Sequence, residues 1–254
     1  MDIKVVTFNG RVDVPVDQNN AWKYRVKGIL EFIQEEQPDI IGMQEMLPHM
    51  VLDLLNELTG YEAIGETRQP NNEAVPIFYW KNKVKLLHTK TYWLSETPDI
   101  PFTKDPSAAC VRVATTALFS IGQQSVLVVN THLDNESETA REKGMQVILS
   151  RLSETNRRPV IIMGDFNANP QELLHQHLIK RRFRSVFEHM NLPKLQTFHG
   201  FGSINEEHPI DYIYTSNQFV VLSSKIECKK YNNSFLSDHY PIVSIVRLYE
   251  GEKL

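Results

Sequence analysis

Residues 160–167 read Val-Ile-Ile-Met-Gly-Asp-Phe-Asn, an apolar run that ends in a glycine and is followed by polar side chains. A short, continuous run rich in β-branched residues is typical of a strand that is buried on both faces of its sheet. Asp165 and Asn167 would then stand at a strand end, where the buried sheet holds them while solvent can reach them. The stretch predicts a sheet protein with functional groups at its strand ends.

Apolar runs of the same kind recur along the whole chain and predict further strands, which cover residues 3–8, 40–43, 76–80, 114–121, 125–129, 160–163, 210–214, 219–222 and 242–248. Amphipathic segments between them predict helices over 20–36, from Pro48 to Gly60, over 137–154 and from Asn169 onward. Asn20 and Asn169 are expected N-caps, with Pro170 as the first residue of the last helix and Glu172 at capping-box spacing.

Strands interleaved with helices are compatible with a doubly wound parallel sheet. Residues 76–94, 112–130 and most of the chain after 195 instead indicate strand-to-strand connections. Mixed sheets with helices outside therefore fit better. We predict an α/β fold that forms one domain over residues 1–254, because there is no repeat, low-complexity tract or linker.

The composition suggests a soluble protein of the cytoplasm. Cys110 and Cys228 are too few for a disulfide framework, and no apolar run reaches the roughly 18 residues of a membrane span. No signal peptide and no obligate protein partner are visible. A net charge of −4 disfavours a protein that coats nucleic acid nonspecifically. It does not disfavour a phosphate substrate, since a bound cation changes the local field.

Polar residues stand at the ends of several predicted strands: Asn9, Glu45, Asn130, His132, Asp134, Asp165, Asn167, Asp211, Asp238 and His239. Each has a structural explanation when it is taken alone, such as a turn-capping asparagine or a hydrogen-bonded histidine. Their recurrence at strand ends has no such structural explanation, because gathering five carboxylates at one edge is costly unless a cation compensates their charge. Oxygen ligands without a cysteine cluster suit Mg²⁺ or Mn²⁺.

The same residues form motifs whose types and order resemble the endonuclease/exonuclease/phosphatase superfamily. The motifs are Phe8-Asn9, Gln44-Glu45, Asn130-Thr-His132-Leu-Asp134, Gly164-Asp165-Phe-Asn167, Ile210-Asp211-Tyr and Ser237-Asp238-His239, and the match runs from residue 3 to about residue 246. That superfamily includes abasic-site endonucleases, DNase I, inositol polyphosphate 5-phosphatases, neutral sphingomyelinases and poly(A) deadenylases. The resemblance implies a four-layered αββα sandwich of two mixed β-sheets flanked by helices, as in DNase I.

The resemblance also implies roles for individual residues. Glu45 resembles the principal metal-binding carboxylate, with Asn9 beside it and Asp238 completing the metal shell. Asp165 resembles the residue that orients or deprotonates the attacking water, and Asn167 the one that stabilises the phosphoryl oxygens.

The remaining motif positions are expected to contact the phosphate. His239 resembles the phosphate-contacting histidine, oriented by Asp211, and His132 would be an additional phosphate ligand. Asn130 and Asp134 lie in the same motif as His132 and are candidate substrate-binding residues.

A few positions outside these motifs remain ambiguous. Arg112 is compatible with bidentate phosphate binding and equally with a structural ion pair. Trp93 and Phe198 are compatible with base stacking, although such residues more often pack in a core or loop. Gly10 stands where a branched apolar residue is expected. The loops 66–76 and 97–110 are expected to set specificity.

The leading functional prediction is a Mg²⁺- or Mn²⁺-dependent phosphodiesterase that acts by in-line attack of water, with a nucleic acid or nucleotide as the preferred substrate class. A phosphomonoesterase or a phospholipase-type enzyme acting on inositol phosphate or sphingomyelin is the alternative within this class. A non-catalytic module that binds phosphate or nucleic acid is the alternative from another class. It is disfavoured because Asp165, Asn167 and His239 are all present.

Overall fold

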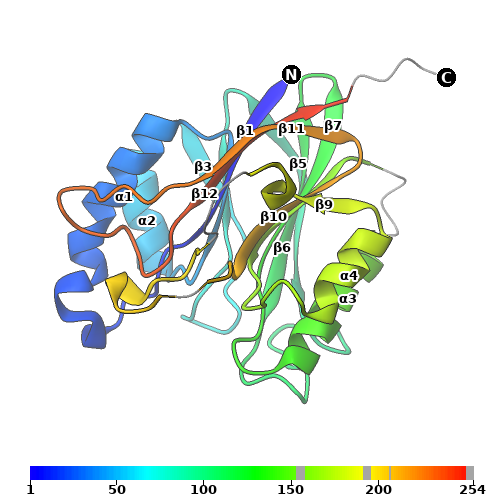
Figure 1. The fold of residues 1–254 in the computed structure, drawn as a ribbon, viewed down its shortest axis with the longest axis horizontal. Coiled ribbons are helices and arrows are strands. Elements are labelled where there is room, and N and C mark those ends of the chain that lie inside the picture. Colours follow the sequence, from blue (N-terminus) through cyan, green and yellow to red (C-terminus); the bar gives the residue numbers. More distant parts are fainter. Residues whose placement is uncertain (153–157, 191–195, 206, 250–254) are drawn as a thin grey trace.

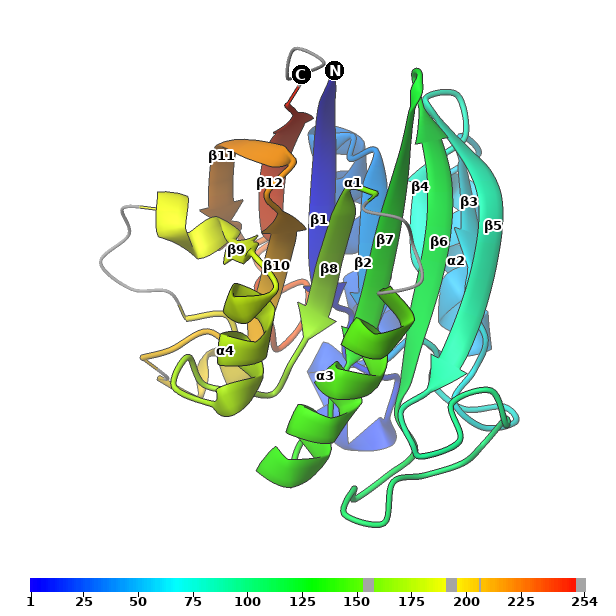
Figure 2. The same cartoon turned by 90° about the vertical axis from the view of Figure 1, so that its right-hand side faces the viewer.

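The structure is a computed structural model, and it describes residues 1–152, 158–190, 196–205 and 207–249. Two β-sheets lie face to face, with α1 and α2 outside one sheet and α3 and α4 outside the other (Figure 1, Figure 2). The first sheet has the order β11-β12-β1-β2-β4-β3. Its strands are β1 (Asp2–Asn9), β2 (Ile40–Gln44), β3 (Tyr61–Ile64), β4 (Ile77–Trp80), β11 (Phe219–Ile226) and β12 (Ile242–Leu248).

The second sheet has the order β5-β6-β7-β8-β10-β9. Its strands are β5 (Val84–Trp93), β6 (Val113–Ile121), β7 (Gln124–His132), β8 (Val160–Asp165), β9 (Phe183–Ser185) and β10 (Asp211–Ser216). Both sheets are mixed, since β1–β2 and β7–β8 are parallel pairs and the other pairings are antiparallel. The predicted α/β sandwich of two mixed sheets is confirmed.

The α-helices are α1 (Trp22–Glu36), α2 (Pro48–Glu57), α3 (Glu138–Leu152) and α4 (Leu173–Lys180), and short 3-10 helices cover Pro15–Asn20, Val186–His189 and Gly200–Gly202. Three apolar layers hold the sandwich together: one between the sheets, one under α1 and α2, and one under α3 and α4. Burial of this apolar surface is the main stabilising contribution. None of the described helices combines the length and hydropathy needed to cross a membrane.

Two predicted helix starts are wrong. Asn20 lies in the 3-10 helix, and α1 begins after Ala21, which makes no side-chain cap. α4 begins after Glu172, because the Asn169 side chain accepts a hydrogen bond from the backbone of Gln171 and closes a turn instead of capping a helix. The end predicted for the third helix, residue 154, lies outside the described residues.

His175 on α4 predicts a specific dependence of stability on pH. Burial lowers the pKa of His175 from 6.5 to about 4. Its ring packs against Phe166, Tyr212 and Tyr214, and its Nδ1 lies 2.8 Å from the Tyr214 hydroxyl. As the pH falls below about 6.5, the unfolded chain takes up a proton on this residue before the folded chain does. Its contribution to stability is therefore lost between about pH 7 and pH 4.

We expect His175→Phe to lower the free energy of unfolding at pH 7, because Tyr214 loses its partner, but to remove this pH dependence. The difference in the free energy of unfolding between wild type and variant should shrink by about 2 kcal/mol from pH 7 to pH 5. Urea unfolding at both pH values measures it. Comparing the two proteins cancels the titration of every other group. A difference that is the same at both pH values would contradict the assignment.

Candidate active site

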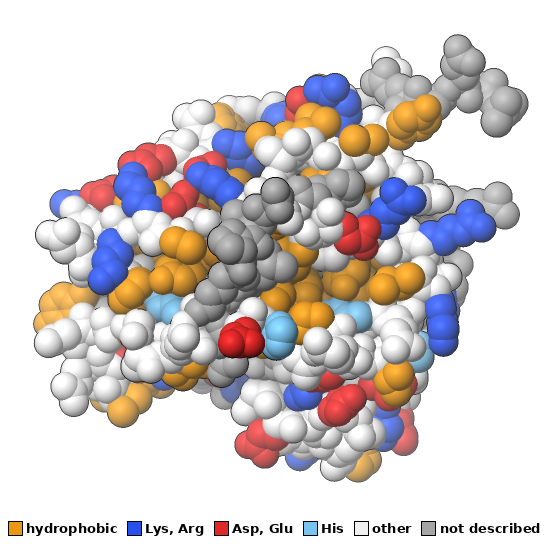
Figure 3. Space-filling view, in the orientation of Figure 1, with side chains coloured by type: hydrophobic (Ala, Val, Ile, Leu, Met, Phe, Trp, Pro, Cys, Tyr) orange, Lys and Arg blue, Asp and Glu red, His pale blue; other side chains and the backbone are white. Residues whose placement is uncertain are grey.

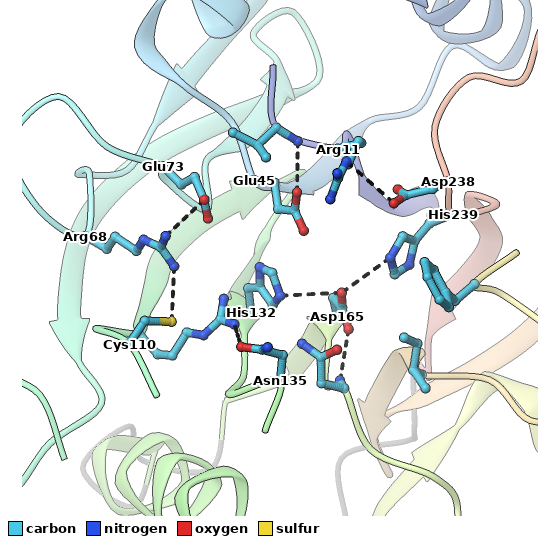
Figure 4. Close-up of a pocket in the computed structure, with 15 residues that line it drawn as sticks. Arg11, Glu45, Arg68, Glu73, Cys110, His132, Asn135, Asp165, Asp238 and His239 are labelled. Carbon is cyan, nitrogen blue, oxygen red and sulfur yellow. Dashed lines mark hydrogen bonds and ion pairs between the residues drawn. The ribbon is translucent and has the colours of Figure 1, made fainter. Parts of the chain in front are cut away.

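The ends of four central strands meet at one edge of the sandwich and form a pocket. β1 and β2 end side by side at Asn9 and Gln44, and β7 and β8 end side by side at His132 and Asp165. Asp211 begins β10 directly opposite Asp165. The pocket has a volume of about 420 Å³, and Figure 4 shows it lined by side chains from both sheets. This volume is ordinary for a small-molecule site.

Gly164 explains how β8 delivers Asp165. It has a φ of +148°, and a Cβ added there would lie 1.9 Å from the Thr131 carbonyl oxygen. Only glycine allows β7 and β8 to approach this closely. The Asp165 carboxylate then accepts hydrogen bonds from the backbone N–H of Asn167 and from Asn9 Nδ2, each at 2.9 Å. The bond to Asn9 joins the two sheets at the pocket floor.

Asp165 is almost wholly buried beside a second carboxylate, that of Asp211. Burial, followed by the proximity of Asp211, raises the pKa of Asp165 to about 7. A group with a pKa near neutrality is suited to accept a proton from water at physiological pH. The environment of Asp165 is thus that of a general base.

His239 is held by Asp211. Its Nδ1 donates to Asp211 Oδ2 at 2.8 Å, and its Nε2 lies 3.8 Å from Asp165 Oδ2. Burial alone would lower the pKa of His239, but the carboxylates of Asp211, Asp165 and Asp238 outweigh it and raise the pKa to about 10. The imidazolium can therefore donate from Nε2 to an anion in the pocket.

The segment 197–200 supports this pair from behind. Thr197 Oγ1 accepts hydrogen bonds from the backbone N–H groups of Ile210 and Asp211, at 3.0 and 3.2 Å. Phe198 forms a β-bridge with His239 and lies with its ring centroid 4.9 Å from the imidazole. Phe198 lines the pocket, as base stacking would require, but the histidine covers part of its surface.

Glu45, which follows β2, and Asp238, which lies in the loop before β12, line the same pocket, and Figure 4 shows the Glu45 carboxylate directed inward. Glu45 Oε1 accepts from Asn9 Nδ2 at 3.1 Å, and Oε2 accepts from the backbone N–H of Val12 at 2.8 Å. Burial and the charge of Glu45 raise the pKa of Asp238. Arg11 Nε lies 3.7 Å from Asp238 Oδ2 and balances part of this charge. The carboxylate oxygens of Glu45 and Asp238 are donors of the kind that a hard divalent cation prefers.

Asn9 lies beside Glu45 and also reaches Asp165. Its Nδ2 bridges the carboxylates of Glu45 and Asp165, while its Oδ1 accepts from the backbone N–H of Arg11 at 2.9 Å. Its amide oxygen keeps a second lone pair, so a role for Asn9 at a metal stays a prediction. Its Nδ2 fixes the spacing between the two carboxylates.

A second group of potential ligands lies beside the first. The described residues place ligand atoms of Asp165, Asp211 and His239 within 4.8 Å of one another. However, the Asp211–His239 hydrogen bond already uses one atom of each of two members. A cation there would compete with the His239 proton, so this group is better suited to proton transfer than to metal binding.

His132 lies at the pocket floor between the two sheets. Its Nε2 is 3.5 Å from Asp165 Oδ2, and its side chain is buried. Burial, followed by the charge of Arg112, lowers the pKa of His132 well below its usual value. A neutral His132 beside His239 gives the pocket two imidazole rings of different charge.

Asn130 and Asp134 do not reach the pocket, so the prediction that they bind substrate is wrong for this geometry. Asn130 is fully buried, donates to the carbonyls of Met43 and Pro76 and accepts from Gln44, which ties the two sheets together. Asp134 accepts backbone hydrogen bonds that fold the loops beside it, from Ala109, Cys110, Glu136 and Ser137. In both residues the polar atoms are saturated by the protein.

Arg112 lines the pocket, and Trp93 does not. Arg112 Nη2 donates to the amide oxygen of Asn135 at 2.9 Å, not to a carboxylate. Its Nε is buried and has no hydrogen-bond partner in the described part of the chain. Trp93 is 3% exposed and donates from Nε1 to the Arg68 carbonyl, so it packs beneath the pocket wall and cannot stack on a base.

Several lining residues carry no motif and were not singled out from the sequence: Arg11, Arg68, Glu73, Cys110 and Asn135. Arg68 and Glu73 lie in the loop 66–76, and Cys110 ends the loop 97–110. Both loops were expected to set specificity, and both contribute to the pocket wall. The fold brings these side chains to the pocket, and nothing in the sequence around them indicates that they line it.

Gly10 stands where the family pattern predicts a branched residue, and the packing explains the difference. A Cβ at Gly10 would lie 2.7 Å from Met46 Sδ and 3.3 Å from Met43 Cε. The methionines fill the space that a side chain at position 10 would occupy.

Comparisons with known proteins agree with this geometry. The model of the endonuclease/exonuclease/phosphatase family matches residues 6–239. An endonuclease/exonuclease/phosphatase from Bacteroides vulgatus has a TM-score of 0.93 at 31% identity, over 98% of this chain and 100% of that one. A mannosyl-6-phosphatase from Bacteroides thetaiotaomicron has a TM-score of 0.89 at 26% identity, over 97% and 99%.

A more distant relative extends the range of chemistry. Bovine tyrosyl-DNA phosphodiesterase 2 is 24% identical over 70% of this chain and 46% of its own length, so the chain spans about half of that relative. The family match covers nearly all the motifs that line the pocket. The chain therefore belongs to the endonuclease/exonuclease/phosphatase family, whose members are phosphoric ester hydrolases.

Proposed function

We propose that this pocket hydrolyses a phosphoester by in-line attack of water, with a divalent cation held by Glu45 and Asp238. The observation that carries the proposal is the convergence of Asp165, with a pKa near 7, and a charged His239 on one small pocket. A general base beside a cationic donor is the arrangement that water attack on phosphorus requires.

The reaction follows from these positions. Asp165 takes a proton from water as the water oxygen forms its bond to phosphorus, and the bond from phosphorus to the leaving oxygen breaks. The leaving oxygen takes up a proton from solvent water and departs as an alcohol. His239 Nε2 and the second N–H of the Asn167 amide, whose first donates to the Leu133 carbonyl, stabilise the charge on the phosphoryl oxygens. His132 supplies a further contact to the phosphate.

The family generally depends on a divalent metal, and the oxygen donors here fit Mg²⁺ or Mn²⁺. When bound, such an ion polarises the phosphoryl group and stabilises charge on the leaving oxygen. Asn9 and the Val12 N–H orient the Glu45 carboxylate toward it. Glu45 has a φ of +61°, an uncommon conformation for this residue type, and strain of this kind is often found at functional sites.

We expect EDTA to abolish activity and Mg²⁺ or Mn²⁺ to restore it. Glu45→Gln should weaken Mn²⁺ binding by at least about tenfold, because it removes a charged ligand. Isothermal titration of the two proteins measures this effect, and Asp211→Asn is the matched comparison. If Asp211→Asn abolishes Mn²⁺ binding while Glu45→Gln retains it, the metal belongs to the Asp165, Asp211 and His239 group instead.

The substrate class follows from the charge and shape of the pocket. The lining holds three arginines and four carboxyl groups, so it offers no excess of positive charge to a polyanion. Arg11 is paired with Asp17, and Arg68 with Glu73. On the face shown in Figure 3, the described lysines and arginines are interspersed with carboxylates and form no continuous stripe. These features favour a small phosphate ester over a nucleic acid strand.

We therefore favour a phosphomonoester over the nuclease-like phosphodiester preferred from the sequence. The mannosyl-6-phosphatase supports the first candidate, and tyrosyl-DNA phosphodiesterase 2 supports the second. Assays of a phosphomonoester and of bis-p-nitrophenyl phosphate, each with Mg²⁺ or Mn²⁺, separate them. If the diester is turned over faster than the phosphomonoester, the nuclease-like phosphodiesterase is the better candidate.

A further inference from the structure

One wall of the pocket has polar groups that the hydrolytic reaction does not use. Arg68, Glu73, Arg112 and Asn135 form this wall, which we name the distal wall. In Figure 4 Arg68 and Glu73 lie across the pocket from Asp238 and His239, with His132 and Asp165 between. A phosphate held beside Asp165 and His239 would direct the rest of its ester toward this wall.

The distal wall is held together by hydrogen bonds, with Arg112 buried, Arg68 and Glu73 partly buried and Asn135 exposed. Arg68 Nη2 donates to Glu73 Oε1 at 3.0 Å, and Arg68 Nε donates to Asn72 Oδ1 at 2.8 Å. Both partners of the ion pair have side chains that are 17% exposed. Arg68 is thereby locked in place, which reduces the entropy cost of binding a ligand.

Some atoms of the wall have no protein partner. Arg112 is 7% exposed, and its Nε is buried without a partner within the described residues. Glu73 lines the pocket, and its Oε2 accepts no hydrogen bond among the described residues, whereas its Oε1 accepts from Arg68. A polar group at a pocket wall with spare hydrogen-bonding capacity is available to a ligand.

The chemistry of these groups selects the ligand. Glu73 brings acceptor oxygens to this wall, and Arg112 and Asn135, which are joined by a hydrogen bond, bring N–H donors. A hydroxyl both donates and accepts, so the hydroxyls of a polyol match a wall that carries both kinds of group. A nucleobase would instead need an aromatic platform, but the only Phe, Tyr or Trp among the described lining residues is Phe198, which packs on His239.

We propose that the distal wall recognises the hydroxyl groups of a sugar or polyol phosphate and so sets the specificity of the enzyme. This inference rests on the proposed phosphomonoester hydrolysis and names the alcohol that it releases. Water adds to phosphorus, the bond from phosphorus to the sugar oxygen breaks, and the products are the free polyol and inorganic phosphate. Glu73 and Asn135 bind the polyol and take no part in the proton transfer.

The test compares two esters with similar leaving groups. Mannose 6-phosphate and n-hexyl phosphate are both primary alkyl phosphates, so the ratio of their kcat/KM values reports hydroxyl recognition. We expect a ratio of at least about 10 for the wild type, because hydrogen bonds to charged groups contribute about 10- to 100-fold. Glucose 6-phosphate and glycerol 3-phosphate extend the series to other polyols.

Glu73→Gln should reduce this ratio by at least about tenfold, and Asn135→Ala, at an exposed position, should reduce it in the same direction. Glu66→Gln is the matched control, because it makes the same change in the same loop outside the pocket lining, and it should leave the ratio as in the wild type. Thermal melting of each variant verifies folding. Equal losses on both esters in both variants would overturn the recognition proposal.

Other outcomes separate this inference from the proposed function. Hydrolysis of p-nitrophenyl phosphate without any preference for polyol phosphates over n-hexyl phosphate would overturn the polyol subsite and leave phosphomonoester hydrolysis standing. Absence of turnover on every phosphomonoester, with Mg²⁺ or Mn²⁺ bound, would overturn the proposed function itself. Preferred cleavage of a single-stranded oligonucleotide would overturn both.

Discussion

Asp165→Asn is expected to lose at least about 10³-fold in kcat/KM on the true substrate while the protein folds normally. The amide is nearly isosteric with the carboxylate, and its single oxygen can still accept from either Asn9 or the Asn167 backbone N–H, although not from both. It cannot take a proton from water, so the attacking oxygen would form its bond to phosphorus without a base. Steady-state kinetics on a small phosphomonoester with saturating Mg²⁺ or Mn²⁺ measures the loss.

The same substitution should change stability in the opposite direction. In the absence of metal, Asp165 is a buried carboxyl next to Asp211, and its raised pKa reports that its ionised form is disfavoured there. A neutral amide removes that repulsion, so the melting temperature in EDTA should rise at neutral pH. A variant that melts below the wild type and also loses activity would indicate misfolding, and a variant with full activity would remove Asp165 from the mechanism.

The short apolar runs predicted mixed sheets with helices outside, and the family resemblance carried by the polar motifs after those runs implied that two such sheets form a sandwich. Residues 160–167 became β8 and the turn that holds Asn167, and the glycine inside them has the close contact that the motif requires. The short edge strands β3 and β9 were not predicted. They are 4 and 3 residues long, and neither carries a fully apolar run.

The sequence was less informative about which polar residues reach the pocket. Asn130 and His132 occupy the same motif two positions apart, yet only His132 lines the pocket. Asn130 does not line the pocket because the packing of the two sheets places its side chain between them, where it accepts a hydrogen bond from Gln44. Contacts between sheets depend on side chains that lie far apart in the chain, and a single sequence does not encode them in a readable pattern.

The pocket wall shows the same limit. The loops 66–76 and 97–110 were expected to set specificity, but the sequence alone does not show which of their side chains contact a substrate. Which of their side chains turn inward depends on ion pairs such as Arg68 with Glu73, whose partners have no motif. The reaction could therefore be proposed from the sequence, whereas the alcohol portion of the substrate required the structure.

His239→Ala is expected to lose at least about 10³-fold in kcat, because it removes the cationic donor nearest Asp165. Asp211 acts through His239, since its carboxylate accepts the Nδ1 proton and does not line the pocket. Asp211→Asn should therefore cost less, about 10- to 100-fold, and should act on kcat more than on KM.

A double variant distinguishes positioning from an independent role. If Asp211 works only by orienting and charging His239, then Asp211→Asn should cause no further loss once His239 is alanine. The measurement is kcat for the wild type, both single variants and the double variant under one metal condition. Multiplicative losses would show that Asp211 affects the reaction independently of His239. It would then act through Asp165, which pairs with it across β8 and β10, or through a cation shared with Asp165.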